Sequence, residues 1–159
     1  MAKGVTMKTT GLDDVVGMLE KLADRGECAS IFTKTVKSGA NVTADYMRKQ
    51  IKSLKTGRNN RRQDKRYCTE NEKKGLLDSM GWAPIKESAG TFDSNIGFDG
   101  YNQHTKTHQA NAKIAHFINR GTSYMIAQPF IVRTRNAGRN EAEAKMIATL
   151  DEEINRRTR

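Results

Sequence analysis

Residues 113–135 read KIAHFINRGTSYMIAQPFIVRTR, and this stretch decides how the second half of the chain folds. Its first part predicts a short apolar helix that ends at residues 120–121, because the glycine there adopts positive φ without a Cβ clash. A turn is expected at residues 122–123. Pro129 has no amide hydrogen, so the extended run that it opens, which reaches residue 134, is predicted to be an edge strand or a strand start. The pattern therefore predicts a structural joint between a helix and a strand.

Two helices are predicted before this joint. Thr10 and Asp13 match a capping box, and apolar residues recur at three- and four-residue steps from there to Leu22. A longer helix is expected next, and Gly39 inside it predicts a bend or a close contact with another helix. The apolar stripe of this second helix consists of Phe32, Val36, Ala40, Ala44, Met47, Ile51 and Leu54.

A hairpin and a last helix complete the predicted elements. Residues 82–86 and 91–98 read as two strands around a turn at 87–90, and the second strand alternates apolar with polar residues. Asn140 is the predicted cap of a C-terminal helix. The buried stripe of that helix is predicted to be Ala144, Ile147, Leu150 and Ile154.

This order of elements predicts an α+β fold: a small antiparallel sheet packed with an N-terminal helix, a long second helix and a C-terminal helix. At 159 residues the chain is expected to form a single domain, 1–159. Two polar segments interrupt it. One is a basic loop or insertion at about 56–74, and the other is a polar loop at about 100–111.

The charge of the chain favours an acidic partner. The formal net charge is +10, and residues 48–74, with eleven basic and three acidic residues, hold +8 of it. Electrostatic contact with phosphates, without reading of bases, is one interpretation of this segment, and a solvated loop is the other. The candidate contacts to DNA in a channel, or to another partner, are Arg58, Arg61, Arg62, Lys65 and Arg66.

Cellular context is indicated by what the sequence lacks. Cys28 and Cys68 lie far apart and match no metal or redox motif, which argues against a disulfide scaffold and for a reducing compartment. The first residues contain no apolar signal segment, and no apolar run approaches the roughly 20 residues that cross a bilayer. We expect a protein made in the cytosol, with no membrane partner.

No catalytic set is expected. His104 and His108 are spaced as two ligands on one side of a helix would be, but no helical stripe surrounds them and no third ligand is evident. His116 lies in an apolar stretch and is interpreted as a packed histidine. Asp93 and Asp99 are ordinary acids of a hairpin, and no nucleotide-binding glycine motif or GxSxG is present. We therefore predict neither an enzyme nor a bound metal or cofactor.

Three passages together resemble the tail-completion family of proteins from long-tailed bacteriophages. Members of this family are also called head–tail joining or neck proteins. The residues of 113–135 that carry the resemblance are Ala115, His116, Phe117, Gly121, Thr122, Gln128, Pro129, Phe130 and Ile131. The earlier segment KKGLLDSM is similar to another family segment through Gly75, Leu77 and Ser79. The third passage is the short helix followed by a long basic helix.

The resemblance implies a structural virion protein without catalysis. Such a protein forms a homo-oligomeric ring, taken as six copies, at the head-proximal end of the tail. Its implied neighbours are a tail terminator or tail-tube protein, a head-completion or stopper protein, and genome DNA in the channel. The predicted edge strand at 129–134 is a candidate for pairing between subunits. One alternative is a free nucleic-acid-binding protein acting through residues 48–74, and a second is a metal-dependent nuclease using His104, His108 and an acid.

Overall fold

The computed structural model describes residues 5–6, 25–57 and 66–157. Within them the fold is α+β, as predicted, with two long helices, two short helices and short antiparallel strands. The predicted helix from Thr10 to Leu22 lies outside the described residues. The elements are β1 (Val5–Thr6), α2 (Arg25–Lys52), α3 (Glu70–Ser79), β2 (Met80–Trp82), β3 (Lys86–Ser88), β4 (Thr91–Asp93), β5 (Asn95–Phe98), α4 (Asn111–Arg120) and α5 (Phe130–Arg157).

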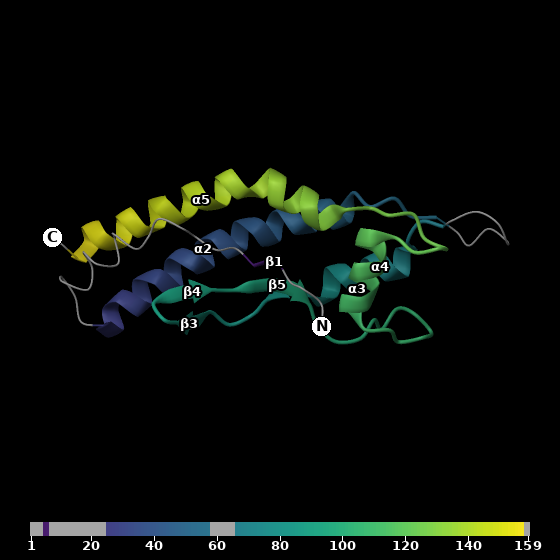
Figure 1. Cartoon of the computed structure of the whole chain (residues 1–159), viewed down its shortest axis with the longest axis horizontal. Coiled ribbons are helices and arrows are strands. Elements are labelled where there is room, and N and C mark those ends of the chain that lie inside the picture. The colour runs from purple at the N-terminus through teal and green to yellow at the C-terminus, as the bar shows by residue number, and fades with distance from the viewer. Residues whose placement is uncertain (1–4, 7–24, 58–65, 158–159) are drawn as a thin grey trace.

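Helix α2 is the centre of the molecule. It packs along α5 on one side and contacts strands β2 and β4 on the other, so that α5, α2 and the strands form successive tiers (Figure 1). Helices α3 and α4 lie at the end where α2 finishes and α5 begins. Of the predicted stripe of α2, all members are buried except Val36, which is half-buried.

Two glycines allow α2 and α5 to approach closely. A Cβ atom on Gly39 of α2 would lie 2.7 Å from the Cγ and Sδ atoms of Met146 on α5. A Cβ atom on Gly138 of α5 would lie 3.0 Å from Cδ2 of Tyr46 on α2. The close helix contact predicted at Gly39 is therefore confirmed.

The predicted strand after Pro129 is wrong, because residue 130 begins helix α5. Proline suits the start of a helix as well as the start of a strand, since the first amides of a helix have no partner within it. The Ile131 amide instead donates to Oδ1 of Asn119 at 3.1 Å, so the end of α4 caps the start of α5. The Thr134 hydroxyl then donates a hydrogen bond to the Phe130 carbonyl at 2.8 Å, within the helix. Asn140 is consequently no cap, since it lies ten residues inside α5.

The buried face of α5 also differs from the prediction. Its buried residues recur at four-residue steps, whereas the prediction used steps of three and four. Ile147, predicted to be buried, is 60% exposed, and Ala144 is exposed too. The buried positions are Phe130, Thr134, Gly138, Ala142, Met146 and Leu150. In a helix of 3.6 residues per turn, residues four positions apart do not lie directly above one another. The buried face therefore rotates slowly around the axis of α5 along its contact with α2.

The predicted hairpin is present with different bounds: its first strand is divided into β2 and β3 by residues 83–85, and its turn is residues 89–90 instead of 87–90. Strand β2 pairs with β5, from Met80 opposite Phe98 onwards, and β3 pairs with β4, from Lys86 opposite Asp93. The register changes by one residue between the two pairs, as expected for a bulge. The turn is Ala89 (φ 51°) followed by a glycine with φ 78°, a geometry that matches the twist of a two-residue hairpin. Strand β1 pairs with the other edge of β5.

Two buried clusters form the core. The larger one joins α2, α3, α4, the start of α5 and the β2–β5 pair, and contains Phe130 at its centre with its ring edge-on to Phe98. The smaller one lies toward the hairpin tip, where Phe32 and Phe92 stack with centroids 5.2 Å apart. The α4 joint and a pocket beside it occupy the end with the larger cluster.

Candidate assembly site

The loop between α4 and α5 is held in place by backbone hydrogen bonds to α4 and to Arg66. Gly121 has φ 75°, and a Cβ atom there would lie 2.9 Å from the Met125 carbonyl oxygen and the Ala127 amide nitrogen, so only glycine fits. The Arg66 amide donates to the Tyr124 carbonyl at 2.9 Å, and the Ile126 amide donates to the Arg66 carbonyl at 3.0 Å. The predicted end of α4 at Gly121 is confirmed, and the loop after it is a fixed structure.

Gln128 connects this loop to the end of α2 through its side chain. Its Oε1 accepts from the Lys55 amide at 2.8 Å, and its Nε2 donates to the Lys55 carbonyl at 3.0 Å. The side chain thus pairs with one residue's backbone as a neighbouring strand would. Cys68 donates its thiol to the same carbonyl, and burial raises the pKa of that thiol to about 11, so it is protonated at neutral pH.

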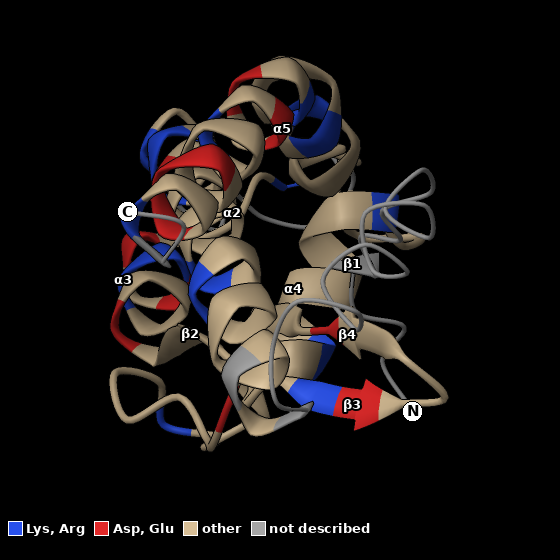
Figure 2. Ribbon diagram, turned by 90° about the vertical axis from the view of Figure 1, so that its left-hand side faces the viewer, with Lys and Arg blue, Asp and Glu red and all other residues tan. Residues whose placement is uncertain are grey.

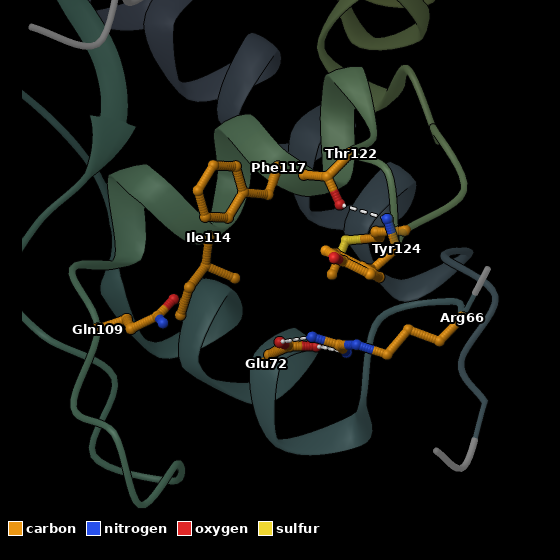
Figure 3. A pocket seen from close by; sticks show the side chains of 8 residues that line it. Arg66, Glu72, Gln109, Ile114, Phe117, Thr122 and Tyr124 are labelled. Carbon is orange, nitrogen blue, oxygen red and sulfur yellow. Dashed lines mark hydrogen bonds and ion pairs between the residues drawn. The ribbon is translucent and has the colours of Figure 1, made fainter. Parts of the chain in front are cut away.

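A half-open pocket of about 300 Å³ lies beside the joint (Figure 3). Its apolar wall consists of Ile114 and Phe117 from α4 with Met125 from the loop. Tyr124, also lining it, is 79% exposed. The remaining lining residues are polar: Arg66, Glu72, Gln109 and Thr122. An apolar hollow with an exposed tyrosine, a methionine and an arginine has the composition typical of protein–protein contact surfaces.

Arg66 and Glu72 form the polar wall of the pocket. The two guanidinium NH groups each donate to a Glu72 carboxylate oxygen at 2.9 Å (Figure 3). The same carboxylate accepts from the Thr69 amide at 2.7 Å, and Thr69 caps α3 in return. Burial alone would raise the pKa of Glu72, but hydrogen bonds from Arg66 and Thr69 outweigh it, so that pKa lies below its ordinary value. The Arg66 charge is therefore engaged within the chain.

Glu72→Gln is expected to lower the free energy of unfolding by about 2 kcal/mol at pH 7, since it removes a charged partner from Arg66 but keeps a capping acceptor. The stabilisation by Glu72 is present above the ordinary carboxyl pKa of 4.5 and is lost as the pH falls through its lowered value. The difference between variant and wild type should thus shrink below about pH 4. Urea unfolding at a series of pH values measures it, with Glu87→Gln, on exposed β3, as the control. A constant difference from pH 7 to pH 3 would contradict this assignment.

The residues of the phage resemblance fall into packed and exposed groups. Ala115 and Phe130 are buried, Gly121 ends α4, and Pro129 is exposed just before α5. Phe117 and Thr122 meet at the pocket. The interpretation of His116 as a packed residue is wrong: its side chain is exposed on α4, because the buried face there is formed by Ile114, Ala115 and Ile118.

The other predicted segment, around Gly75, is part of α3. Gly75 is buried against the Asn102 side chain, and Leu77 is half-buried against the larger core cluster. Ser79 is the last residue of α3, and its hydroxyl is buried without a hydrogen-bond partner among the described residues. Because α3 begins at Glu70, the predicted basic loop ends five residues earlier than expected, at the capping box. Of the candidate DNA contacts, Arg58, Arg61, Arg62 and Lys65 lie outside the described residues.

The two histidines considered as metal ligands have different surroundings. His104 Nε2 lies 2.7 Å from an Asp78 carboxylate oxygen, and its amide donates to Asn102. His108 is exposed in a strained conformation with φ 42°. In the described part of the chain, no three His, Cys, Asp or Glu side chains lie together in an arrangement that would hold a metal ion. The helices of that part also include none with the length and apolarity of a membrane span.

Charge of both signs is spread over the long helices (Figure 2). Helix α5 carries arginines at 133, 135 and 139 near its start and acids at 151, 152 and 153 near its end. Because α5 runs back along α2, those arginines lie at the same end as Lys52 and Lys55. The arginines at the start of α5 thus add positive charge to the end of the molecule where the basic segment 48–74 begins.

Sequence interpretation missed three residues that build this region. The capping role of Glu72 could have been predicted, since Thr69 and Glu72 have the spacing of a capping box before an apolar run. Asn102 accepts locally from the His104 amide, but its bond to the Asn71 carbonyl on α3 joins distant segments. The bond between Tyr124 and Arg66 also joins distant segments, so neither long-range contact had a local signal.

Comparison with known proteins found no family model, curated protein or solved structure that matches this chain.

Proposed function

We propose that the chain is a structural virion protein of a long-tailed phage, which forms a ring at the head-proximal end of the tail and completes the tail for head–tail joining. It acts without catalysis. The observation that carries the proposal is the resemblance of residues 113–135 to the tail-completion family. The position of those residues supports it, since the packed ones fix a joint that presents Phe117, Thr122 and Tyr124 at a surface pocket.

The surface of the chain also suits an assembly role. Large hydrophobic side chains that are exposed in the described residues are Tyr101, Tyr124, Val132 and Ile147. Of these, Tyr124 lines the pocket, and tyrosine is enriched at protein–protein contact surfaces. The expected neighbours in the virion are further copies of the chain, a tail terminator or tail-tube protein, and a stopper protein.

The test is to inactivate the gene in the phage that encodes it and to analyse the lysate. We expect DNA-filled heads and separate tails, with infectious titre lowered by about a hundredfold or more, and restoration by the wild-type chain supplied in trans. Electron microscopy of purified tails should show a ring at one end that contains the chain. Normal joined particles without the chain, or catalytic cleavage of nucleic acid by the pure protein, would refute the proposal.

Nucleic-acid binding is the second candidate, favoured by the basic end of the molecule. A free DNA-binding protein would show affinity for duplex DNA that falls steeply with salt. A charge-reversal variant tests whether the basic segment contributes to head–tail joining. It changes Arg61, Arg62 and Lys65 to Glu and leaves Arg66 unchanged, because Arg66 is paired with Glu72. If this variant joins heads and tails normally, those three residues have no role in the proposed function.

A further inference from the structure

From two matching helix surfaces we infer that neighbouring copies of this chain bind through α4 of one copy and, on the next copy, an exposed side of α5 next to its buried face. The inference rests on the proposed ring and names the surfaces that would form it. We call the first the α4 surface (Lys113, Phe117 and Arg120 with the adjacent pocket) and the second the α5 surface (Glu143, Ile147 and Asp151).

The α4 surface has an apolar centre between two cations. Phe117 lines the pocket together with Ile114 and Met125. Lys113 lies four residues before Phe117 and places its Nζ 5.6 Å from the centroid of that ring. Arg120 lies three residues after Phe117, on the same side of the helix, and is exposed. At about 300 Å³ the pocket is at the lower limit of ligand sites, a size that suits one or two side chains better than a large ligand.

The α5 surface has an apolar centre between two acids. Ile147 is 60% exposed, although the buried face of α5 runs along the four-residue steps beside it. Its neighbours at four residues on either side are Glu143 and Asp151, and Ala144 extends the apolar centre. Glu143 also pairs with Arg139 at 2.7 Å, so Asp151 makes the larger charge contribution. Lys145, two residues from Ile147, faces another direction.

The two surfaces match in spacing as well as in charge. At 1.5 Å per residue, Lys113 and Arg120 are about 10.5 Å apart along α4, and Glu143 and Asp151 are about 12 Å apart along α5. Ile147 of one copy can thus enter the pocket beside Phe117 while both pairs of opposite charges meet. Each copy carries both surfaces on different helices, so the contact is head-to-tail and can be repeated around an axis.

Mixing two cysteine variants of the full chain tests the pairing. Ile147→Cys and Tyr124→Cys, each on a separate chain, should form an oxidised or short cross-linked dimer when mixed, and neither should do so alone. Cys28 and Cys68 are buried, so the wild-type chain is the background control. Glu152→Cys mixed with Tyr124→Cys is the matched control and should not cross-link. Cross-linking of Ile147→Cys with itself would indicate a symmetric contact and would overturn the inference.

Charge reversal gives an independent readout by sedimentation of the full chain over a concentration series. Lys113→Glu with Arg120→Glu should weaken self-association about tenfold, and Glu143→Lys with Asp151→Lys should do the same. The chain with all four reversals should regain the wild-type association. Rings that form normally in every variant would overturn the inference and leave the proposed function standing. A wild-type chain that stays monomeric at every concentration would overturn the inference, whereas joined particles without the chain would refute the function itself.

Discussion

Gly75→Ala is expected to lower the free energy of unfolding by about 3 kcal/mol, the larger of the two main stability effects. A Cβ atom at this position of α3 would lie 2.7 Å from Oδ1 of Asn102 and closer still to its other amide atoms. The Asn102 side chain is fully buried and cannot move aside without losing its bonds. It donates to the Asn71 carbonyl at 3.1 Å and accepts from the His104 amide at 2.8 Å. The midpoint of urea unfolding, followed by circular dichroism, measures the loss.

The control for this prediction is Gly26→Ala. Gly26 also lies in a helix, but a Cβ atom there would meet nothing within 4 Å, so we expect a change below about 1 kcal/mol. Asn102→Ala removes the obstacle, so the double variant with Gly75→Ala should lose less stability than the two single losses added together. Additive losses, or a Gly75→Ala chain as stable as the control, would show that Asn102 does not restrict residue 75.

The second large effect is expected for Gln128→Leu, at about 2 to 3 kcal/mol of unfolding free energy. Leucine keeps the size of the side chain but leaves the Lys55 amide without its acceptor and removes a donor from the Lys55 carbonyl. The end of α2 would then separate from the start of α5. We expect a lower urea midpoint together with faster hydrogen exchange at the Lys55 amide.

The variant Gln128→Glu keeps the size of the side chain and changes only its hydrogen bonds, so it distinguishes the contribution of the bonds to stability from that of packing. The new carboxylate faces the Lys55 carbonyl, and burial should raise its pKa in the folded chain above that in the unfolded chain. Its cost is therefore present at neutral pH and is relieved as the pH falls and the carboxyl is protonated, so the difference from wild type should shrink toward pH 4. Gln103→Leu, at an exposed position, is the control. A pH-independent loss for Gln128→Glu would contradict the assigned bonds.

The sequence predicted the elements whose signals are local. The α+β class, the stripe of α2, the hairpin and the end of α4 at Gly121 follow from periodicity and from glycine geometry, and the structure has all four. Gly39 was correctly associated with a close helix contact, although the partner, Met146, was not identifiable. Local patterns give the type of an element without the element that it meets.

The errors have a common cause in tertiary context. Pro129 is compatible with a strand start and with a helix start, and the choice depends on Asn119, whose side chain caps α5 from another helix. The stripe of α5 was assigned at steps of three and four residues, whereas packing against α2 selects steps of four and leaves Ile147 exposed. The prediction that His116 is packed rested only on its apolar neighbours. A helix also has a solvent-facing side, and His116 lies on that side of α4.

The candidate assembly site was predictable only in part. Phe117 and Thr122 were named from the resemblance, but their shared pocket depends on Arg66, which is 51 to 56 positions away in the chain and is held by Glu72. Tyr124 is 79% exposed, and this exposure has no sequence signature of its own. A surface made by several segments needs the fold before it can be recognised.

The separation of the two long helices in the sequence has a consequence for biosynthesis. Helix α2 ends at Lys52 and its partner α5 begins only at Phe130, so the largest contact of the molecule joins the most distant described helices. At about 5 to 20 residues per second, the ribosome needs roughly 4 to 16 seconds to make the intervening segment of about 80 residues. During that time the side of α2 that faces α5 lacks its partner. The nascent chain is therefore expected to depend on chaperones until α5 emerges, and truncation within α5 should give aggregates.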